Sequence, residues 1–173
     1  MSSLSLAATA LLVFFGEQPV IQKTGEEYSP KGGNFTIRFP AKPKESTQKA
    51  KSPIGEVDVF AATCATNDGN VYMVSYSDLP EKATRKENLD TLFEGVREGA
   101  KGDGTVRVCD KIEFGPMKLP GRELKLMKDK QWVRMYAIVR DNRLYQIAAV
   151  GSQSFAEGKE ANAFLESFQL ISK

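Results

Sequence analysis

The sequence predicts an α+β domain in which helices pack on the faces of an antiparallel β-sheet. Two strand-like runs near the carboxyl end, Gln131–Arg140 and Arg143–Gly151, are separated only by Asp141-Asn142. Asp and Asn tolerate the backbone angles of a tight hairpin, so the two runs are expected to pair. Segments in which apolar and polar residues alternate, as in strands, are separated by stretches whose apolar residues have helical spacing. Runs of strands broken by single helices favour an antiparallel sheet with helices on its faces.

The first strands come before any helical pattern. Residues 34–39 alternate, which puts Phe35, Ile37 and Phe39 on one side of a strand. Residues 45–52 and 56–66 are predicted to pair across a turn at 53–55, and 71–77 continues the meander after a turn at 67–70. Lysines in 45–52 are typical of an edge strand, where charge discourages pairing with other molecules.

A helix is expected next, because Thr84 and Glu87 fit a capping box. Its apolar residues recur at steps of three and four and form one stripe toward the sheet: Leu89, Leu92, Phe93, Val96 and Ala100. Glycines in 101–104 suit its end. Residues 105–114 alternate again, and a turn-rich loop at 115–121 is expected to lead into a strand at 122–128.

The carboxyl end closes the predicted domain. Ser154 and Glu157 fit a second capping box, and Phe164 and Phe168 lie on one face of the helix expected after it. The strand at 143–150 is apolar on both phases. We therefore expect it to lie centrally in the sheet, with both of its faces covered.

The chain length of 173 residues suits one domain. Residues 1–16 include an apolar segment that is too short to span a bilayer comfortably but matches the core of an export signal. A retained anchor, or a buried element of a cytoplasmic fold, is the alternative. Residues 17–33 are polar and are predicted to form a linker, and 34–171 form the domain. The expected location is periplasmic, extracellular or lumenal, with membrane contact only through the first segment.

Composition argues against several functions. Lys and Arg total 24 against 22 Asp and Glu, so there is no strong field for nucleic acid, and no such partner is expected. There is no histidine, the residue most used in proton transfer near neutral pH and in binding transition metals. We therefore expect no catalysis, no cofactor and no metal site. Glu94 and Glu98 are four residues apart on a helix and are better explained by solubility than by acid–base chemistry.

Three features occur in an order that resembles the PsbP-like family: the run 32–40 (GGNFTIRFP), the hairpin at 141–145 and the closing pair Phe164 and Phe168. That family adopts an α/β/α sandwich that is also seen in the Ran-binding Mog proteins. The resemblance implies an exported, non-enzymatic domain that docks to a larger assembly. It implies no calcium, chloride, photosystem or Ran contact, because no residue here matches such a site.

The two cysteines, Cys64 and Cys109, allow two interpretations. In an exported protein they could form a disulfide. However, Cys109 shares its strand phase with Arg107 and Lys111, whereas Cys64 shares its phase with Phe60, so two separate thiols are the alternative.

A basic and aromatic cluster is the candidate for partner binding: Arg122, Lys125, Lys128, Lys130, Trp132 and Arg134. An anionic docking surface is one interpretation, and an ordinary solvated face is the other. Trp132, Arg134 and Tyr136 alternate on one strand, so they could instead form half of a core with one salt-bridged arginine.

The leading hypothesis is an exported binding or assembly protein whose partner is a protein or an envelope complex. The second hypothesis is a carrier of a lipid or metabolite, with an apolar pocket between sheet and helix lined by Phe93, Met73 and Tyr136. An unusual enzyme that uses serine, lysine and carboxylates is a distant third. Glycines at 32–33 and 102–104, and the Asp-Gly pairs at 68 and 103, are predicted to serve turns and caps.

Overall fold

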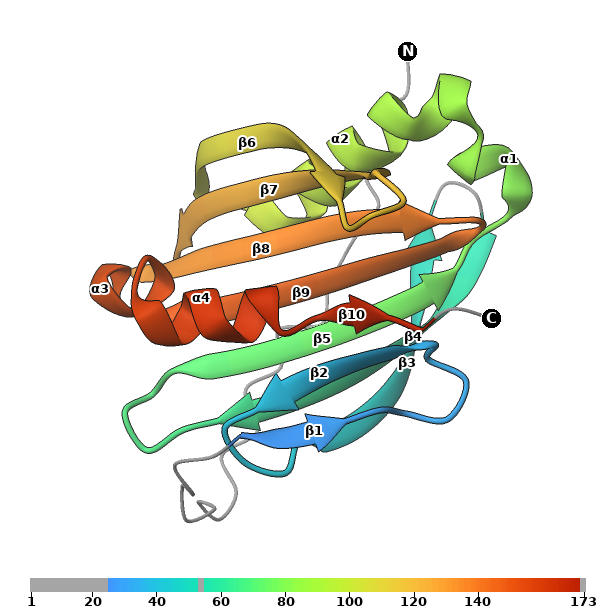
Figure 1. Cartoon of the computed structure of the whole chain (residues 1–173). Coiled ribbons are helices and arrows are strands. Elements are labelled where there is room, and N and C mark those ends of the chain that lie inside the picture. The colour runs from blue at the N-terminus through green and yellow to red at the C-terminus, as the bar shows by residue number, and fades with distance from the viewer. Residues whose placement is uncertain (1–24, 53–54, 172–173) are drawn as a thin grey trace.

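The computed structural model describes residues 25–52 and 55–171, and one seven-stranded antiparallel sheet dominates it (Figure 1). The strand order in this sheet is β3-β4-β5-β9-β8-β7-β6. The bounds of its strands are β3 Lys44–Ser52, β4 Gly55–Ala65, β5 Val71–Asp78, β6 Thr105–Phe114, β7 Leu119–Lys128, β8 Gln131–Arg140 and β9 Arg143–Gly151.

Different elements cover the two faces of the large sheet. Helix α2 (Leu89–Lys101), preceded by the short turns α1 (Glu81–Thr84) and η1 (Lys86–Asn88), packs on one side, which we call the α2 face. The opposite side, the α4 face, carries α3 (Gln153–Ala156) and α4 (Lys159–Glu166). A small sheet in the order β1-β2-β10 lies beside α4 and consists of β1 (Glu26–Tyr28), β2 (Phe35–Phe39) and β10 (Gln169–Leu170).

The predicted antiparallel sheet with helices on both faces is thus present. Strands hold far more of the described residues than helices do, so the domain is richer in sheet than a balanced α/β/α sandwich. No helix among residues 25–52 and 55–171 is long and apolar enough to cross a membrane. The expected export signal at 1–16 lies outside the described residues.

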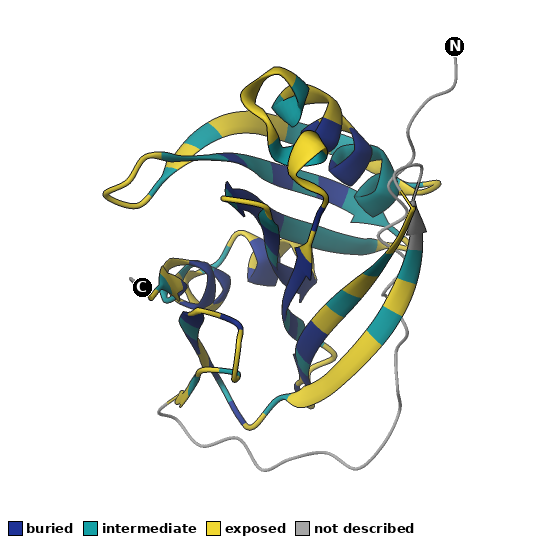
Figure 2. Cartoon of the chain, turned by 90° about the vertical axis from the view of Figure 1, so that its right-hand side faces the viewer, coloured by how far each residue is buried: buried dark blue, intermediate teal, exposed yellow. Residues whose placement is uncertain are grey.

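Strand β9 occupies the centre of the sheet, as its two apolar phases predicted. It pairs with β5 on one side and β8 on the other, and most of its side chains are buried (Figure 2). Tyr145 and Ile147 face α4, whereas Leu144 and Ala148 face α2. The lysine-bearing β3 is an edge strand, which confirms that prediction. Its Lys49 forms an ion pair with Glu56 at 2.8 Å.

Each face has its own hydrophobic cluster. On the α4 face the cluster is aromatic, because rings from β2, β5, β9, α3 and α4 meet there: Phe35, Phe39, Tyr72, Tyr145, Phe155, Phe164 and Phe168. On the α2 face the stripe of α2 packs as predicted, and Leu92, Phe93 and Val96 contact aliphatic residues of the sheet. The central sheet therefore separates two hydrophobic cores.

The helix starts differ from the prediction. Thr84 ends α1 and donates a hydrogen bond to the Glu81 carbonyl at 3.1 Å, and Asn88 precedes α2 without a side-chain cap. At the carboxyl end Ser152, not Ser154, is the cap, and its hydroxyl accepts from the amide of Phe155 at 3.2 Å. The capping-box pattern was wrong there because the helix begins two residues earlier and stops after one turn.

Three further elements depart from the sequence analysis. Residues 26–28, expected in the linker, form β1 by pairing with β2. Strand β7 begins at Leu119, not at residue 122, because the turn before it is tight and Lys118 adopts a φ of 49°. Phe168 lies beyond the end of α4, although it is buried with Phe164.

Candidate functional site

The six residues of the expected partner-binding patch divide between the two faces of the sheet. In the β7–β8 register, Lys125 lies opposite Arg134 and Met127 opposite Trp132, so these side chains share the α4 face. Arg122 and Lys128 have the other parity and lie on the α2 face, and Lys130 is in the turn between the strands. The six therefore do not form one surface.

Arg134 holds α4 to the sheet. Its guanidinium donates to Glu123 at 2.7 Å, to Asn162 of α4 and to the Tyr136 hydroxyl at 3.3 Å. Burial alone would lower the pKa of Arg134, but the hydrogen bond with Glu123 and the nearby Tyr136 outweigh it, so the pKa lies above its usual value. Of the predicted half core, Arg134 is salt-bridged and Tyr136 packs against the aromatic cluster, whereas Trp132 belongs to neither cluster of the described residues.

Arg122 has the corresponding role on the other face. It forms an ion pair with Asp90 of α2, and its guanidinium lies 4.6 Å from the centre of the Phe93 ring. Lys111 of β6 also reaches Asp90, at 3.2 Å. The hydrogen bond from Lys111, with help from Arg122, lowers the pKa of Asp90. These contacts fix α2 and leave Arg122 little freedom for a partner.

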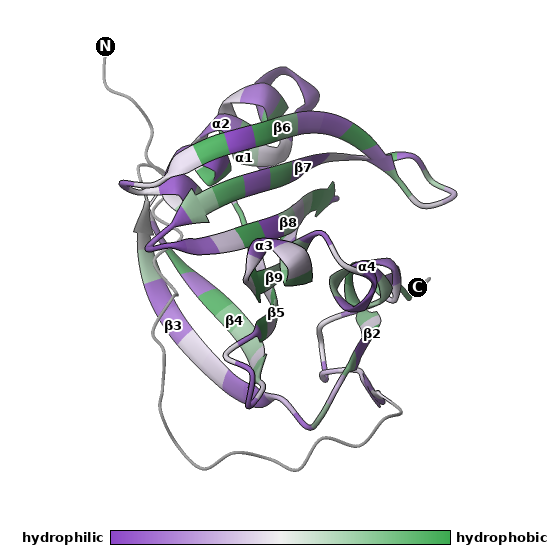
Figure 3. Cartoon of the chain, turned by 90° about the vertical axis from the view of Figure 1, so that its left-hand side faces the viewer, coloured by the Kyte–Doolittle hydropathy of each residue, from purple (hydrophilic) through white to green (hydrophobic). Residues whose placement is uncertain are grey.

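What remains of the expected patch is a strip on the α4 face of β6, β7 and β8. We call it the open strand face and define it by four half-buried residues: Val108, Lys125, Met127 and Trp132. Helices α3 and α4 contact β8 and β9 and have no substantial contact with β6 or β7. The three apolar side chains of the open strand face, Val108, Met127 and Trp132, belong to neither buried cluster of the described residues. Figure 3 shows β6 and β7 rising beyond these helices, with apolar and polar residues alternating along them.

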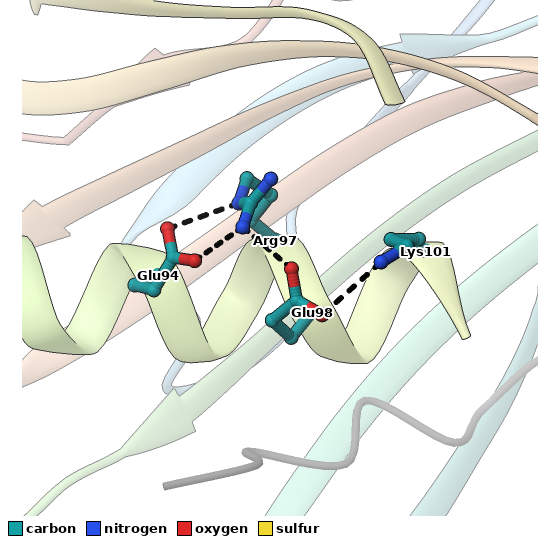
Figure 4. Close-up of polar contacts among 4 residues, drawn as sticks. All are labelled: Glu94, Arg97, Glu98 and Lys101. Atoms are coloured by element: carbon teal, nitrogen blue, oxygen red, sulfur yellow. Dashed lines mark hydrogen bonds and ion pairs between the residues drawn. The ribbon is translucent and has the colours of Figure 1, made fainter. Parts of the chain in front are cut away.

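Glu94 and Glu98 form ion pairs with basic residues of the same helix, α2. Arg97 contacts both Glu94 and Glu98, and Lys101 reaches Glu98 at 3.4 Å (Figure 4). The hydrogen bond from Arg97 lowers the pKa of Glu94 and so keeps this group ionised, the opposite of what a general acid needs. The structure agrees with a surface role for both glutamates.

Cys64 and Cys109 are both free thiols. Cys64 is buried on the α4 face of β4, and burial raises the pKa of its thiol. Cys109 is exposed on the outermost strand at the opposite end of the sheet. Of the two interpretations, separate thiols is the one that the structure shows, because β4 and β6 lie far apart in the strand order.

The pocket expected for a carrier does not form from the residues that suggested it. Phe93 and Met73 belong to the cluster on the α2 face, whereas Tyr136 packs with the aromatic cluster on the other face. The central sheet therefore separates them. A different hollow, of about 430 Å³, is open to solvent and is lined by residues of polar and charged types: Glu81, Thr84, Arg85, Asp141 and Asn142. This lining does not suit a lipid.

The glycine and Asp-Gly segments serve turns, as expected. Gly69 has a φ of 77° in the β4–β5 turn, and Gly102 follows α2 with a φ of 52° and an amide bonded to the Glu98 carbonyl. Among the described residues, no three Cys, Asp or Glu side chains gather as a metal site would require.

Sequence analysis missed one polar cluster, centred on Arg143. Its guanidinium forms a two-point ion pair with Asp78, donates to the carbonyls of Gly32 and Gly33, and lies 4.7 Å from the centre of the Tyr76 ring. The hydrogen bond with Asp78 raises the pKa of Arg143. This cluster fastens the turn before β2 to the central strands. Its only sequence signal is an arginine directly after the hairpin turn, which is too common to be diagnostic.

No family model matches the sequence, and no curated protein matches it either. Among solved structures, cyanobacterial PsbP (CyanoP) from Synechocystis sp. PCC 6803 is similar, with a TM-score of 0.57 and 13% identity over 94% of this chain and 100% of that chain. A Pseudomonas aeruginosa protein of unknown function, PA94, called a putative regulator, gives a TM-score of 0.46 and 10% identity over 87% and 98%. The chain therefore has a PsbP-like fold.

Proposed function

From this fold we propose that the chain is an exported, non-catalytic binding domain that docks to a larger protein assembly. The open strand face carries the proposal. It presents Trp132, Met127 and Val108 beside the cationic Lys125. Val108, Lys125 and Met127 are on β6 and β7, with which α3 and α4 have no substantial contact. Tryptophan and methionine are enriched in protein interfaces, where their side chains supply contact area. The charge of Lys125 at their side favours a partner surface of opposite charge.

Two other observations support docking over the alternatives. The residues expected to line a carrier pocket lie on opposite faces of the sheet, in two separate hydrophobic clusters. Beside the open strand face, Glu123 and Arg134 are paired with each other at 2.7 Å and so have a structural role. A PsbP-like fold alone is compatible with many functions, so the surface and not the fold is the argument.

Site-specific photocrosslinking in the native cells tests the proposal. A benzophenone amino acid replaces Lys125 on the open strand face or, as the matched control, the exposed Lys86 of η1. We expect a discrete adduct with one protein complex only from position 125, and we expect Trp132→Ala to reduce it about tenfold or more. If adducts were equal at both positions, or if the purified protein instead retained a lipid or metabolite, the docking role would be refuted.

Export is tested separately by fractionation and by sequencing the mature amino terminus. Removal of roughly the first sixteen residues, with the protein found outside the cytoplasm, is the expected result. A mature chain that still begins at Met1 in the soluble cytoplasm would contradict it.

A further inference from the structure

The two longer helices each cover two neighbouring strands of the large sheet. Of its seven strands, α2 has substantial contact only with β6 and β7, and α4 only with β8 and β9. Neighbouring strands are about 4.8 Å apart, so two strands span roughly 10 Å, which is close to the diameter of a helix with its side chains. The α4 face of β6 and β7, where most of the open strand face lies, therefore has the width of one further helix beside α4.

The residues of this face form rows across the strands, with apolar residues at both ends and charged residues between them. At one end Met127 lies opposite Trp132. At the other end Ile112 reaches over Gly121, since a Cβ atom on that glycine would lie 3.0 Å from the Cγ1 atom of Ile112. From the first end to the second, the rows are Met127–Trp132, Val108–Lys125, Asp110–Glu123 and Ile112–Gly121.

Two opposite charges in the middle rows are left without an ion pair by the described part of the chain. Lys125 and Asp110 form none there, whereas Glu123 between them is paired with Arg134 at 2.7 Å. A partner that buries this face gains by matching both charges. The face thus favours an acidic residue over Lys125 and a basic residue over Asp110.

The spacing of these two charges matches a helix. Consecutive rows are two residues apart along a strand, about 6.8 Å, and residues four apart on a helix are separated by about 6.0 Å along its axis. An acidic and a basic residue at i and i+4 can therefore meet Lys125 and Asp110 together. A strand added to the sheet would instead lie beside β6, two strands away from Trp132 on β8.

We infer that the open strand face binds one amphipathic helix of the partner protein, which lies along β6 and β7 beside α4. Its apolar side contacts Trp132, Met127 and Ile112, because apolar residues of such a helix recur every three or four positions on one face. Its acidic residue meets Lys125, and its basic residue meets Asp110. The helix is the partner element recognised in the proposed docking function, and its assignment rests on that function.

Photocrosslinking from the two ends of the face measures the shape of the bound segment in the native cells. A benzophenone amino acid replaces Met127 or Ile112, whose rows are three steps apart, about 20 Å along the strands. A helix rises about 1.5 Å per residue, so mass spectrometry of the adducts should locate two partner sites roughly 13 residues apart. A bound strand would separate them by about six residues, and that result, or sites on unrelated segments, would overturn the helix.

Charge reversal tests the assigned ion pair separately. Lys125→Glu should reduce the adduct from position 127 about fivefold, because an attractive pair becomes repulsive. Lys86→Glu on the exposed η1 is the matched control and should leave the adduct unchanged. Replacement of the partner's acidic residue by lysine should recover most of the loss. An equal loss in both variants, or a partner replacement without recovery, would refute the pairing at Lys125.

The docking function and the bound helix fail in different ways. No adduct from position 125, 127 or 112 would refute docking itself. Adducts with the spacing of a strand would leave docking in place and refute the helix alone.

Discussion

Replacement of Phe164 by alanine tests how firmly α4 is held on the sheet. The ring is 3% exposed, and its centre lies 5.1 Å from the ring centres of both Phe39 and Tyr72. Truncation of a well-packed phenylalanine costs about 3–5 kcal/mol, because transfer free energy and packing contacts are both lost. Each aromatic pair adds about 0.5–1.5 kcal/mol. Part of this pair energy is already included in the cost of truncating the phenylalanine. We expect the free energy of unfolding to fall by about 4 kcal/mol.

Urea denaturation at neutral pH, followed by the fluorescence of the single tryptophan, Trp132, measures this loss. Phe60→Ala is the matched control, because Phe60 is 37% exposed and stacks only on Tyr76, with 4.9 Å between ring centres. It should cost about 1 kcal/mol. The contradicting result would be a Phe164→Ala variant that loses no more unfolding free energy than Phe60→Ala, with the same slope of that free energy against urea concentration. In that case Phe164 would not hold α4 against the aromatic cluster.

Three further predictions concern single groups. In the native protein, Cys109 should react with a thiol reagent at once and Cys64 only after unfolding; two fast equivalents would contradict the burial of Cys64. Burial raises the pKa of Tyr72 to about 12, so the folded state resists ionisation of this hydroxyl. Its contribution to the free energy of unfolding should be fully present below the ordinary pKa near 10 and should be lost as the pH rises through 12. Between these pH values the urea midpoint should fall less steeply with pH in Tyr72→Phe than in the wild type. An equal fall in both proteins would mean that Tyr72 is not the group responsible. Arg143→Lys should lower the free energy of unfolding by roughly 1–2 kcal/mol, because the second point of the ion pair on β5 is lost; calorimetry that shows no change would mean that the two-point geometry is not stabilising.

Patterns that depend on one strand or helix were predicted well. The apolar stripe of α2 and the two apolar phases of β9 placed each element correctly against the sheet, because periodicity directly reflects which side chains face the core. Cap positions were predicted less well. Thr84 and Ser154 fit the capping pattern, yet neither begins a helix, since short turns and an earlier cap at Ser152 satisfy the local amides first.

The candidate patch failed for a physical reason that a single sequence does not display. Arg122 and Lys125 are three residues apart, so on one strand their side chains point to opposite faces of the sheet. The polar partners of the two arginines lie on other elements: Arg122 forms an ion pair with Asp90, and Arg134 forms an ion pair with Glu123 and a hydrogen bond with Asn162. In the sequence, an exposed basic residue cannot be told from one that holds two elements together through an ion pair, because its ion-pair partner is not visible there.

The sequence by itself determined the class of the fold, the central place of β9 and the PsbP-like order of elements, because periodicity, turn chemistry and hydrophobic length act locally. Only the tertiary structure decided that two cores exist and that Phe93 and Tyr136 are divided by the sheet. It also decided that β6 is the last strand in the order of the described sheet. These are statements about which distant segments lie side by side, and long-range pairing depends on the sum of many contacts that no local pattern contains.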